Sequence, residues 1–164
     1  MSLYRIFEQL DWQELRERAE TSNRRRAHFN LHSSYEEAVQ KTLICLLNGT
    51  YIPPHYHRHS HQKELFVVLH GLVKVVFFNQ VGLITDVIYL GDDVKSFMIE
   101  VFPQSIHTVV CLSEHARVME VKQGPFVEDD CKEFLDWTVP EFSQLSDGYA
   151  NWLKNAEVGD IFGI

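Results

Sequence analysis

Residues 49–71 read GTYIPPHYHRHSHQKELFVVLHG, a histidine-rich segment that runs into an apolar strand pattern. His55 and His57 are two residues apart, so on a strand they point the same way and lie about 6.6 Å apart along it. Two imidazoles in this arrangement can reach one ion, and Glu64 at the start of the next strand can add a carboxylate oxygen. Together with the later His107, these residues predict a metal site inside a small β-barrel.

Composition limits the classes of partner. The chain has 164 residues, of which 45% are hydrophobic and 23% charged, as in an ordinary globular domain. The formal net charge of −8 argues against nucleic acid and against anionic lipid, because both require a basic face. The three cysteines are far apart in the sequence and no apolar run could span a bilayer, so we expect a reduced, cytoplasmic protein that does not enter a membrane.

Hydrophobic periodicity divides the chain into three parts of one domain. Residues 1–23 show helical spacing, and Asp11 with Glu14 resembles an N-cap and its capping-box partner, which would give two short helices on the outside of the barrel. Residues 24–124 alternate between polar and apolar side chains in about nine or ten short segments separated by turns, which predicts an antiparallel barrel or jelly roll. Residues 125–164 are predicted to be a partly helical extension.

The motifs around the histidines resemble those of a known superfamily. The first cupin motif is a glycine, a His-x-His pair, a glutamate and a closing glycine, and the second supplies a further histidine. The matching positions in this chain are Gly49, His55, His57, Glu64 and Gly71 for the first motif, and 103–107 for the second. The resemblance implies an all-β cupin-type double-stranded β-helix whose metal ligands are His55, His57, Glu64 and His107.

One branch of the superfamily, the WbuC-type cupin-fold metalloproteins, is more similar still. Its marks here are Arg26, His28, Asn30 and His32 ahead of the barrel, the stretch 64–67, and the stretch 120–125. Proteins of this branch are often encoded among genes for surface polysaccharide biosynthesis, which implies a sugar or sugar-nucleotide ligand. The resemblance and the exposed edge strands of an open sheet imply a homodimer.

Two positions depart from the superfamily pattern. The usual glycine of the second motif is Gln104, whose side chain could disturb the turn that carries His107. Cys111 occupies the position of the asparagine that usually ends the second motif. It is either a buried neighbour of the metal or a small core residue. His59 and His61 continue the alternation, so either could replace a named ligand, or both could lie on an exposed loop.

Three imidazoles and one carboxylate form a mixed donor set. This set suits one divalent transition metal ion, namely Fe, Mn, Ni, Co or Zn, and the sequence does not select among them. The alternative is that the four residues are ordinary polar residues lining the barrel.

Residues 24–32 are the second segment expected to have a function. One face carries Arg26, His28, Asn30 and His32, and an arginine fork recognises carboxylate or phosphate. We expect Arg26, Asn30 and His32 to bind the substrate and His28 to move a proton near neutral pH. The same pattern fits a solvated edge strand or a strand donated to a dimer partner.

These residues predict a protein that binds or acts on a small polar molecule, anionic or sugar-related, at the metal. Catalysis would make it a metal-dependent oxygenase, isomerase or epimerase, depending on the ion. A non-catalytic metal-dependent binding or sensor module is equally compatible with the fold. A purely structural metal is the third alternative, although structural zinc sites usually contain cysteine.

Overall fold

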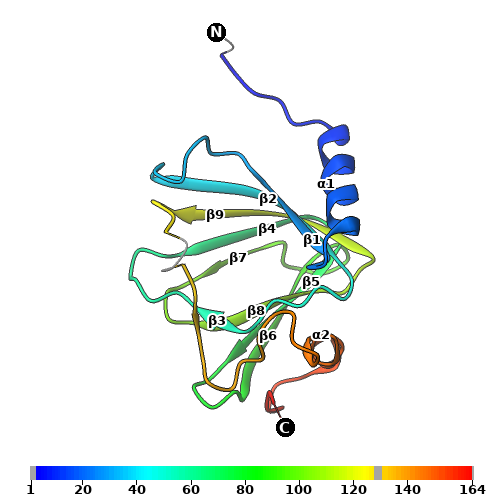
Figure 1. Ribbon diagram of the computed structural model, residues 1–164, viewed down its shortest axis with the longest axis vertical. Helices are drawn as coiled ribbons and strands as arrows, with labels where there is room; N and C mark the ends of the chain where they lie inside the picture. The colour runs from blue at the N-terminus through cyan, green and yellow to red at the C-terminus, as the bar shows by residue number, and fades with distance from the viewer. Residues whose placement is uncertain (1–2, 128–130, 164) are drawn as a thin grey trace.

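Two antiparallel five-stranded sheets pack face to face in the computed structural model, which describes residues 3–127 and 131–163. Figure 1 shows the sheets stacked as the two walls of a jelly roll, with one helix beside each wall. The predicted all-β jelly roll is therefore confirmed. None of the helices in the described ranges is long and apolar enough to cross a bilayer.

The first sheet carries the segment rich in arginine and histidine at its edge. Its central pairings place Glu64 opposite both Lys122 and Val101. The strand order is β1 (Arg26–Asn30), β2 (Val39–Leu47), β9 (His115–Gln123), β4 (Glu64–His70) and β7 (Met98–Val101).

The second sheet carries the other histidines. His55 lies directly opposite His107 in the antiparallel pairing of two neighbouring strands. The strand order is β10 (Glu133–Phe134), β3 (His55–Tyr56), β8 (Ile106–Cys111), β5 (Leu72–Phe78) and β6 (Ile84–Gly91).

An apolar core fills one part of the space between the sheets. Alternate residues of each strand point inward, as the period of two requires, and they interlock across the two walls. Among them are Val73, Val75, Leu90, Cys111, Ala116 and Val118, all at most 2% exposed. Burial of this surface drives the sheets together, and the polar residues described below line the remaining space.

The N-terminal region differs from its prediction. A single helix, α1 (Gln9–Thr21), begins after Glu8, whose side chain and that of Asp11 form the capping box; the predicted pair was Asp11 with Glu14. Only Leu15 and Ala19 are fully buried against the first sheet. Residues 3–8 precede the helix as an extended arm that leaves the barrel (Figure 1), so Leu3 and Ile6 are exposed, whereas Phe7 is half-buried and packs edge-on against Phe29.

The strand that carries the predicted binding residues is shorter than expected. It begins at Arg26 rather than at residue 24 because Arg25 has a left-handed backbone (φ 53°), with its Nε donating to the carbonyl of Asn48. The predicted alternation within the strand is correct: Ala27 is buried toward α1 while His28 faces the other way.

The C-terminal extension is attached firmly to the second sheet. Its short strand β10, which the sequence did not predict, pairs with β3. Farther along, α2 (Ser146–Asn155) buries Ala150 and Leu153 against β5 and β8. The fully buried Lys74 of β5 donates from Nζ to the carbonyls of Leu153 and Ala156, and so satisfies acceptors at the C-terminal end of α2.

Candidate functional site

Four side chains from separate parts of the chain converge between the sheets. His55 and His107 come from adjacent strands of the second sheet, His57 follows β3, and Glu64 begins β4 on the opposite wall. One ligand atom from each residue lies within 4.8 Å of those of the others, and all four side chains are buried, at most 4% exposed. The structure thus brings together all four residues predicted to bind metal.

The backbone orients each of the three imidazole rings. Nδ1 of His55 lies 2.9 Å from the carbonyl oxygen of Pro53, and Nδ1 of His107 lies 2.9 Å from that of Ser105. Nδ1 of His57 lies 2.5 Å from the carbonyl oxygen of Cys131. Because a carbonyl oxygen only accepts, each Nδ1 carries the proton, and each Nε2 has a free lone pair.

These lone pairs point at a carboxylate that has no proton to share. Nε2 of His57 and of His107 lie 2.8 and 3.1 Å from Oε2 of Glu64, and within the described residues none of these three buried atoms has a hydrogen-bond partner. Acceptors facing acceptors in a buried site are costly unless a cation lies between them. Three imidazole rings, each held through Nδ1, and one carboxylate oxygen are a donor set that suits a mononuclear metal centre.

The carboxylate of Glu64 is held by a lysine that sequence reasoning did not select. Nζ of Lys122 lies 2.5 Å from Oε1 of Glu64 and 2.9 Å from Oε1 of Glu120. Burial favours the neutral carboxyl, but opposing effects, of which the positive charge of Lys122 is the largest, outweigh it and keep the pKa of Glu64 well below its ordinary value. Lys122 therefore holds one oxygen and leaves Oε2 free to face the histidines. The opposed register of β4 and β9 creates this pair.

Electrostatics also keep His55 in the form that binds metal. Burial lowers the pKa of His55 well below 6.5, and the positive charge of Lys132 adds to this effect. A neutral ring at pH 7 is the species that coordinates a metal ion.

The glutamine that departs from the superfamily pattern does not displace its neighbouring ligand. Gln104 takes the left-handed conformation (φ 66°) that favours glycine, and its backbone N–H donates to the carbonyl of His57 at 2.8 Å. The chain therefore turns as a glycine would allow, and His107 reaches the cluster. The side chain of Gln104 strains the local backbone but does not change the path of the turn.

The remaining residues considered as ligands lie outside the cluster. His59 and His61 are on the turn before β4, where their rings stack with centroids 5.6 Å apart. Cys111 lies in the apolar core, with Sγ 3.4 Å from the carbonyl of Leu46. Of the two alternatives given for each residue, the loop position is therefore correct for His59 and His61, and the core position is correct for Cys111.

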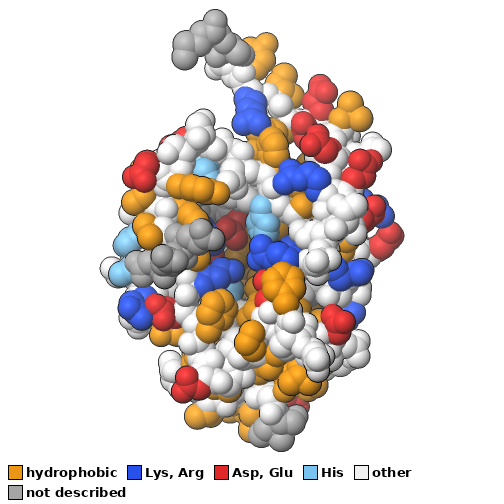
Figure 2. Space-filling model, viewed as in Figure 1, with side chains coloured by type: hydrophobic (Ala, Val, Ile, Leu, Met, Phe, Trp, Pro, Cys, Tyr) orange, Lys and Arg blue, Asp and Glu red, His pale blue; other side chains and the backbone are white. Residues whose placement is uncertain are grey.

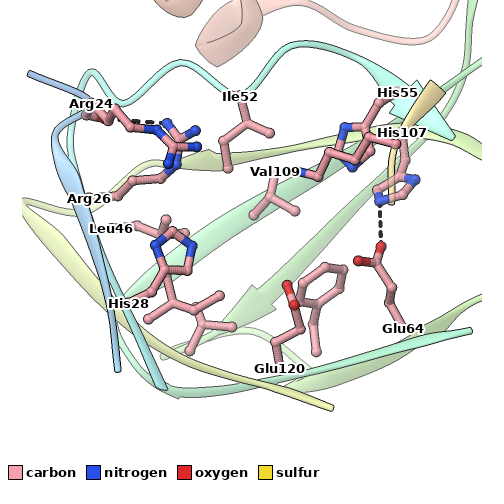
Figure 3. Close-up of a pocket in the computed structure, with 14 residues that line it drawn as sticks. Arg24, Arg26, His28, Leu46, Ile52, His55, Glu64, His107, Val109 and Glu120 are labelled. Atoms are coloured by element: carbon pink, nitrogen blue, oxygen red, sulfur yellow. Dashed lines mark hydrogen bonds and ion pairs between the residues drawn. The ribbon is translucent and has the colours of Figure 1, made fainter. Parts of the chain in front are cut away.

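A small cavity of about 60 Å³ opens beside the cluster. Figure 3 shows Arg24, Arg26 and His28 on one side of it, facing His55, His107 and Glu64 across a floor of apolar residues. Two of the predicted ligand-contacting residues, Arg26 and His28, therefore line the same cavity as the metal cluster. Asn30 and His32 line a larger groove outside it.

Arg26 is already occupied by partners within the protein. Its Nη1 lies 2.7 Å from Oε1 of Glu141 and donates to the Tyr51 carbonyl at 3.0 Å and to Oγ1 of Thr50 at 3.2 Å. Burial lowers the pKa of Arg26 while Glu141 raises it, so the guanidinium stays charged. Glu141 also pairs with Nε of Arg24 at 3.2 Å. The sequence held no signal for this carboxylate, which belongs to the C-terminal extension.

His28 lies among cations at the cavity wall. Desolvation within the cavity, together with repulsion from Arg26, Arg24 and other cations, lowers its pKa to about 3. His28 is also partly open to solvent, because it lines the outer groove as well as the cavity. A neutral His28 at pH 7 is a weak proton acceptor until an anion enters the cavity.

A family model covers about half of the chain. This model, described as "Domain of unknown function (DUF6016)", matches residues 7–90. A comparison with curated protein sequences finds no match.

Solved structures give the same architecture at low sequence identity. Protein SO0799 of Shewanella oneidensis has 14% identity and a TM-score of 0.55, over 68% of this chain and 74% of that one. The capsular polysaccharide assembling protein CapF of Staphylococcus aureus has 18% identity and a TM-score of 0.55, over 70% of this chain but only 33% of CapF. The fold is the predicted cupin jelly roll, and the site within it is a His-His-Glu-His cluster.

Proposed function

The chain belongs to the family described as domain of unknown function (DUF6016), and we propose that it is a mononuclear metal protein that binds or transforms a small anionic molecule. The observation that carries this proposal is the convergence of one ligand atom from each of three histidines and Glu64, all within 4.8 Å of one another, with Nδ1 of every ring facing a backbone carbonyl. Without a cation, Nε2 of His57, Nε2 of His107 and Oε2 of Glu64 would face one another, buried and without hydrogen-bond partners among the described residues, at a cost in stability.

The chain itself would hold one divalent ion through His55, His57, Glu64 and His107. Four protein ligands leave open positions on an ion that prefers five or six, and such an ion, when bound, polarises a ligand oxygen or lowers the pKa of a bound water. The donor set suits Fe, Mn, Ni, Co or Zn, and redox chemistry would require iron or another redox-active ion.

The charge around the cavity and the groove beside it supports an anionic ligand. Arg24, Arg26 and Lys132 line the cavity in a protein whose net charge is −8. Repulsion among these groups lowers the pKa of His28 and of Lys132, in both cases after burial as the main cause. An anion would relieve that repulsion, so the cavity favours carboxylate or phosphate over a neutral ligand.

A non-catalytic binding or sensor role is the second candidate, and one observation favours it. Arg26 is fixed by Glu141, and His28 is a weak base at pH 7, so neither residue is prepared to transfer a proton in the ligand-free state. Catalysis would need the ligand to raise the pKa of His28 first. Mass spectrometry of a ligand recovered after incubation distinguishes the two roles, because a sensor returns it unchanged.

The finer assignments rest on resemblance. The motifs at residues 26–32 and 120–125 support membership of the WbuC-type branch, and with it a sugar-related ligand. CapF is named as a capsular polysaccharide assembling protein, and we extend that context to this chain as a proposal. A homodimer is proposed because β1 and β7 are edge strands, and sedimentation velocity would give its mass.

Elemental analysis tests the metal proposal. Protein purified without chelator should contain about one transition ion per chain, and His57→Ala should lose most of it. His61→Ala is the matched control, because His61 is an exposed histidine outside the cluster and its removal should leave the content unchanged. Wild-type protein that stays folded and takes up none of the five ions would overturn the proposal. Equal metal content in His57→Ala and wild type would remove His57 from the site.

A further inference from the structure

The cavity beside the metal cluster is too small for a whole sugar-sized molecule. One water needs roughly 10–15 Å³ of such space. The cavity of about 60 Å³ therefore holds only a few water-sized groups. A ligand of more than about ten non-hydrogen atoms could place only one end beside the metal ligands, and its body would need another site.

A larger groove continues from that cavity to the surface. It encloses about 670 Å³, and the two spaces share Arg24, His28, Glu120 and Lys132 as wall residues. Figure 2 shows Lys and Arg side chains and a histidine around a hollow on this face of the molecule. The shared residues make one continuous site with a narrow inner end and a wide outer end.

Lys132 lies at the junction and is available to a ligand. It lines the cavity, the groove and a third pocket on the other side of Arg24 and Arg26. Arg26 is paired with Glu141, and Lys122 is held by two carboxylates. Lys132 forms no ion pair or hydrogen bond with any residue in the described ranges. An unpaired cation in a half-buried position is a ready partner for an acidic group.

The groove also contains buried polar atoms that need partners. Gln40 is 5% exposed, and its Nε2 contacts the carbonyls of Ser34, Tyr35 and Glu37, which fixes Oε1 as the free acceptor. Neither this Oε1 nor Nε2 of the 9% exposed His32 has a hydrogen-bond partner among the residues described. The Gln40 oxygen calls for a hydroxyl or N–H donor. Nε2 of His32 instead needs an acceptor, because Nδ1 of that ring accepts from the backbone N–H of Lys41 at 3.1 Å and Nε2 therefore carries the proton. Asn30 lines the same groove and adds both a donor and an acceptor.

We propose that the groove is a second ligand subsite, and that the ligand is a polyhydroxylated organic anion, a sugar acid or sugar phosphate, whose acidic group binds Lys132. Its small reactive end enters the cavity, and its hydroxyl-bearing body lies along Gln40, His32 and Asn30. The assignment of the inner end rests on the proposed metal function. The binding roles of Lys132 and the groove depend only on residues of the chain.

Calorimetry with defined probes tests this assignment. Metal-loaded protein is titrated with glucose 6-phosphate, gluconate, inorganic phosphate and glucose. We expect one of the two sugar anions to bind about tenfold or more tightly than either inorganic phosphate or neutral glucose, since only the anion with a body uses both subsites. The tighter of the two identifies the acidic group as phosphate or carboxylate. Equal affinity for all four probes, or no binding of any, would overturn the proposal.

Variants separate the two parts of the subsite. Lys132→Met should weaken binding of the preferred sugar anion about tenfold, Lys132→Arg should retain it, and Lys95→Met, which removes an exposed lysine between β6 and β7, should leave it unchanged. Asn30→Leu should weaken the sugar anion but not inorganic phosphate. Unchanged affinity in both Lys132→Met and Asn30→Leu would refute the groove as a subsite.

Repeating the titrations with metal-free protein keeps this result distinct from the metal proposal. The dependence on Lys132 should persist at lower affinity after chelation. If no ion binds at all, the proposed function fails while the comparison of Lys132→Met with wild type still decides the role of the groove. If Lys132→Met binds like wild type in both states, the inference fails while the metal result stands.

Discussion

Lys122→Met should destabilise the metal-free protein strongly. Lys122 Nζ lies 2.5 Å from a carboxylate that is 2% exposed, and its own side chain is 22% exposed. Removing one partner of a buried ion pair costs about 3–5 kcal/mol because the other charge is left without compensation. Since Lys122 retains some contact with water, we expect a loss of stability at the lower end of this range, about 3 kcal/mol.

The expected shift in melting temperature follows from the chain length. For 150–250 residues, 1 kcal/mol corresponds to about 2–4 °C, so Lys122→Met should melt about 6–12 °C below wild type. Circular dichroism melts in the presence of EDTA at pH 7 measure it. Lys63→Met is the matched control, because Lys63 and Glu100 form a half-exposed pair with a 3.8 Å contact that should contribute about 0–1 kcal/mol.

Two further measurements define the cause. The double variant Lys122→Met with Glu64→Gln should recover part of the loss, because it removes the stranded charge. Adding one equivalent of Co²⁺ or Zn²⁺ should bring the melting temperature of Lys122→Met closer to that of wild type, since a cation would again face Glu64. A Lys122→Met melt as close to wild type as that of Lys63→Met, without metal, would refute the assignment of Lys122 as the counter-ion that positions the carboxylate.

Three other outcomes follow from buried groups away from the site. Burial raises the pKa of the Cys45 and Cys111 thiols to about 11, so iodoacetamide at pH 8 should label them far more slowly in native than in unfolded protein, and equal rates by mass spectrometry would contradict this. Lys74→Met should lower the free energy of unfolding by about 1–3 kcal/mol in urea titrations, because it leaves carbonyls at the end of α2 unsatisfied; a neutral effect would mean that water replaces Nζ. Burial, aided by Arg16, lowers the pKa of His115 below 6.5, so the unfolded chain binds the proton more readily and stability should fall as the pH drops below about 6.5. His115→Asn should make that fall shallower, and an unchanged pH profile would exclude His115 as its source.

Local patterns were enough to predict the fold class and to select the four residues that the structure brings together as a His-His-Glu-His cluster. Strand parity is a property of two adjacent peptide units, so His55 and His57 could be placed on one side before any pairing was known. The turn signals around each short strand are also local in the sequence, and their even spacing predicted an antiparallel jelly roll. Helix α1 was predicted with the wrong start, because Asp11 with Glu14 and Glu8 with Asp11 are both plausible capping pairs and only the direction of the preceding arm distinguishes them.

The partners of the site residues depended on contacts between distant parts of the chain. The register of β4 against β9 places Lys122 opposite Glu64, and the path of residues 131–141 along the second sheet brings the Cys131 carbonyl to His57 and Glu141 to Arg26. No periodicity in the sequence encodes these pairings, since each joins residues more than fifty positions apart. The sequence by itself therefore determined which side chains can bind an ion. Only the tertiary structure decided which charges hold them in place.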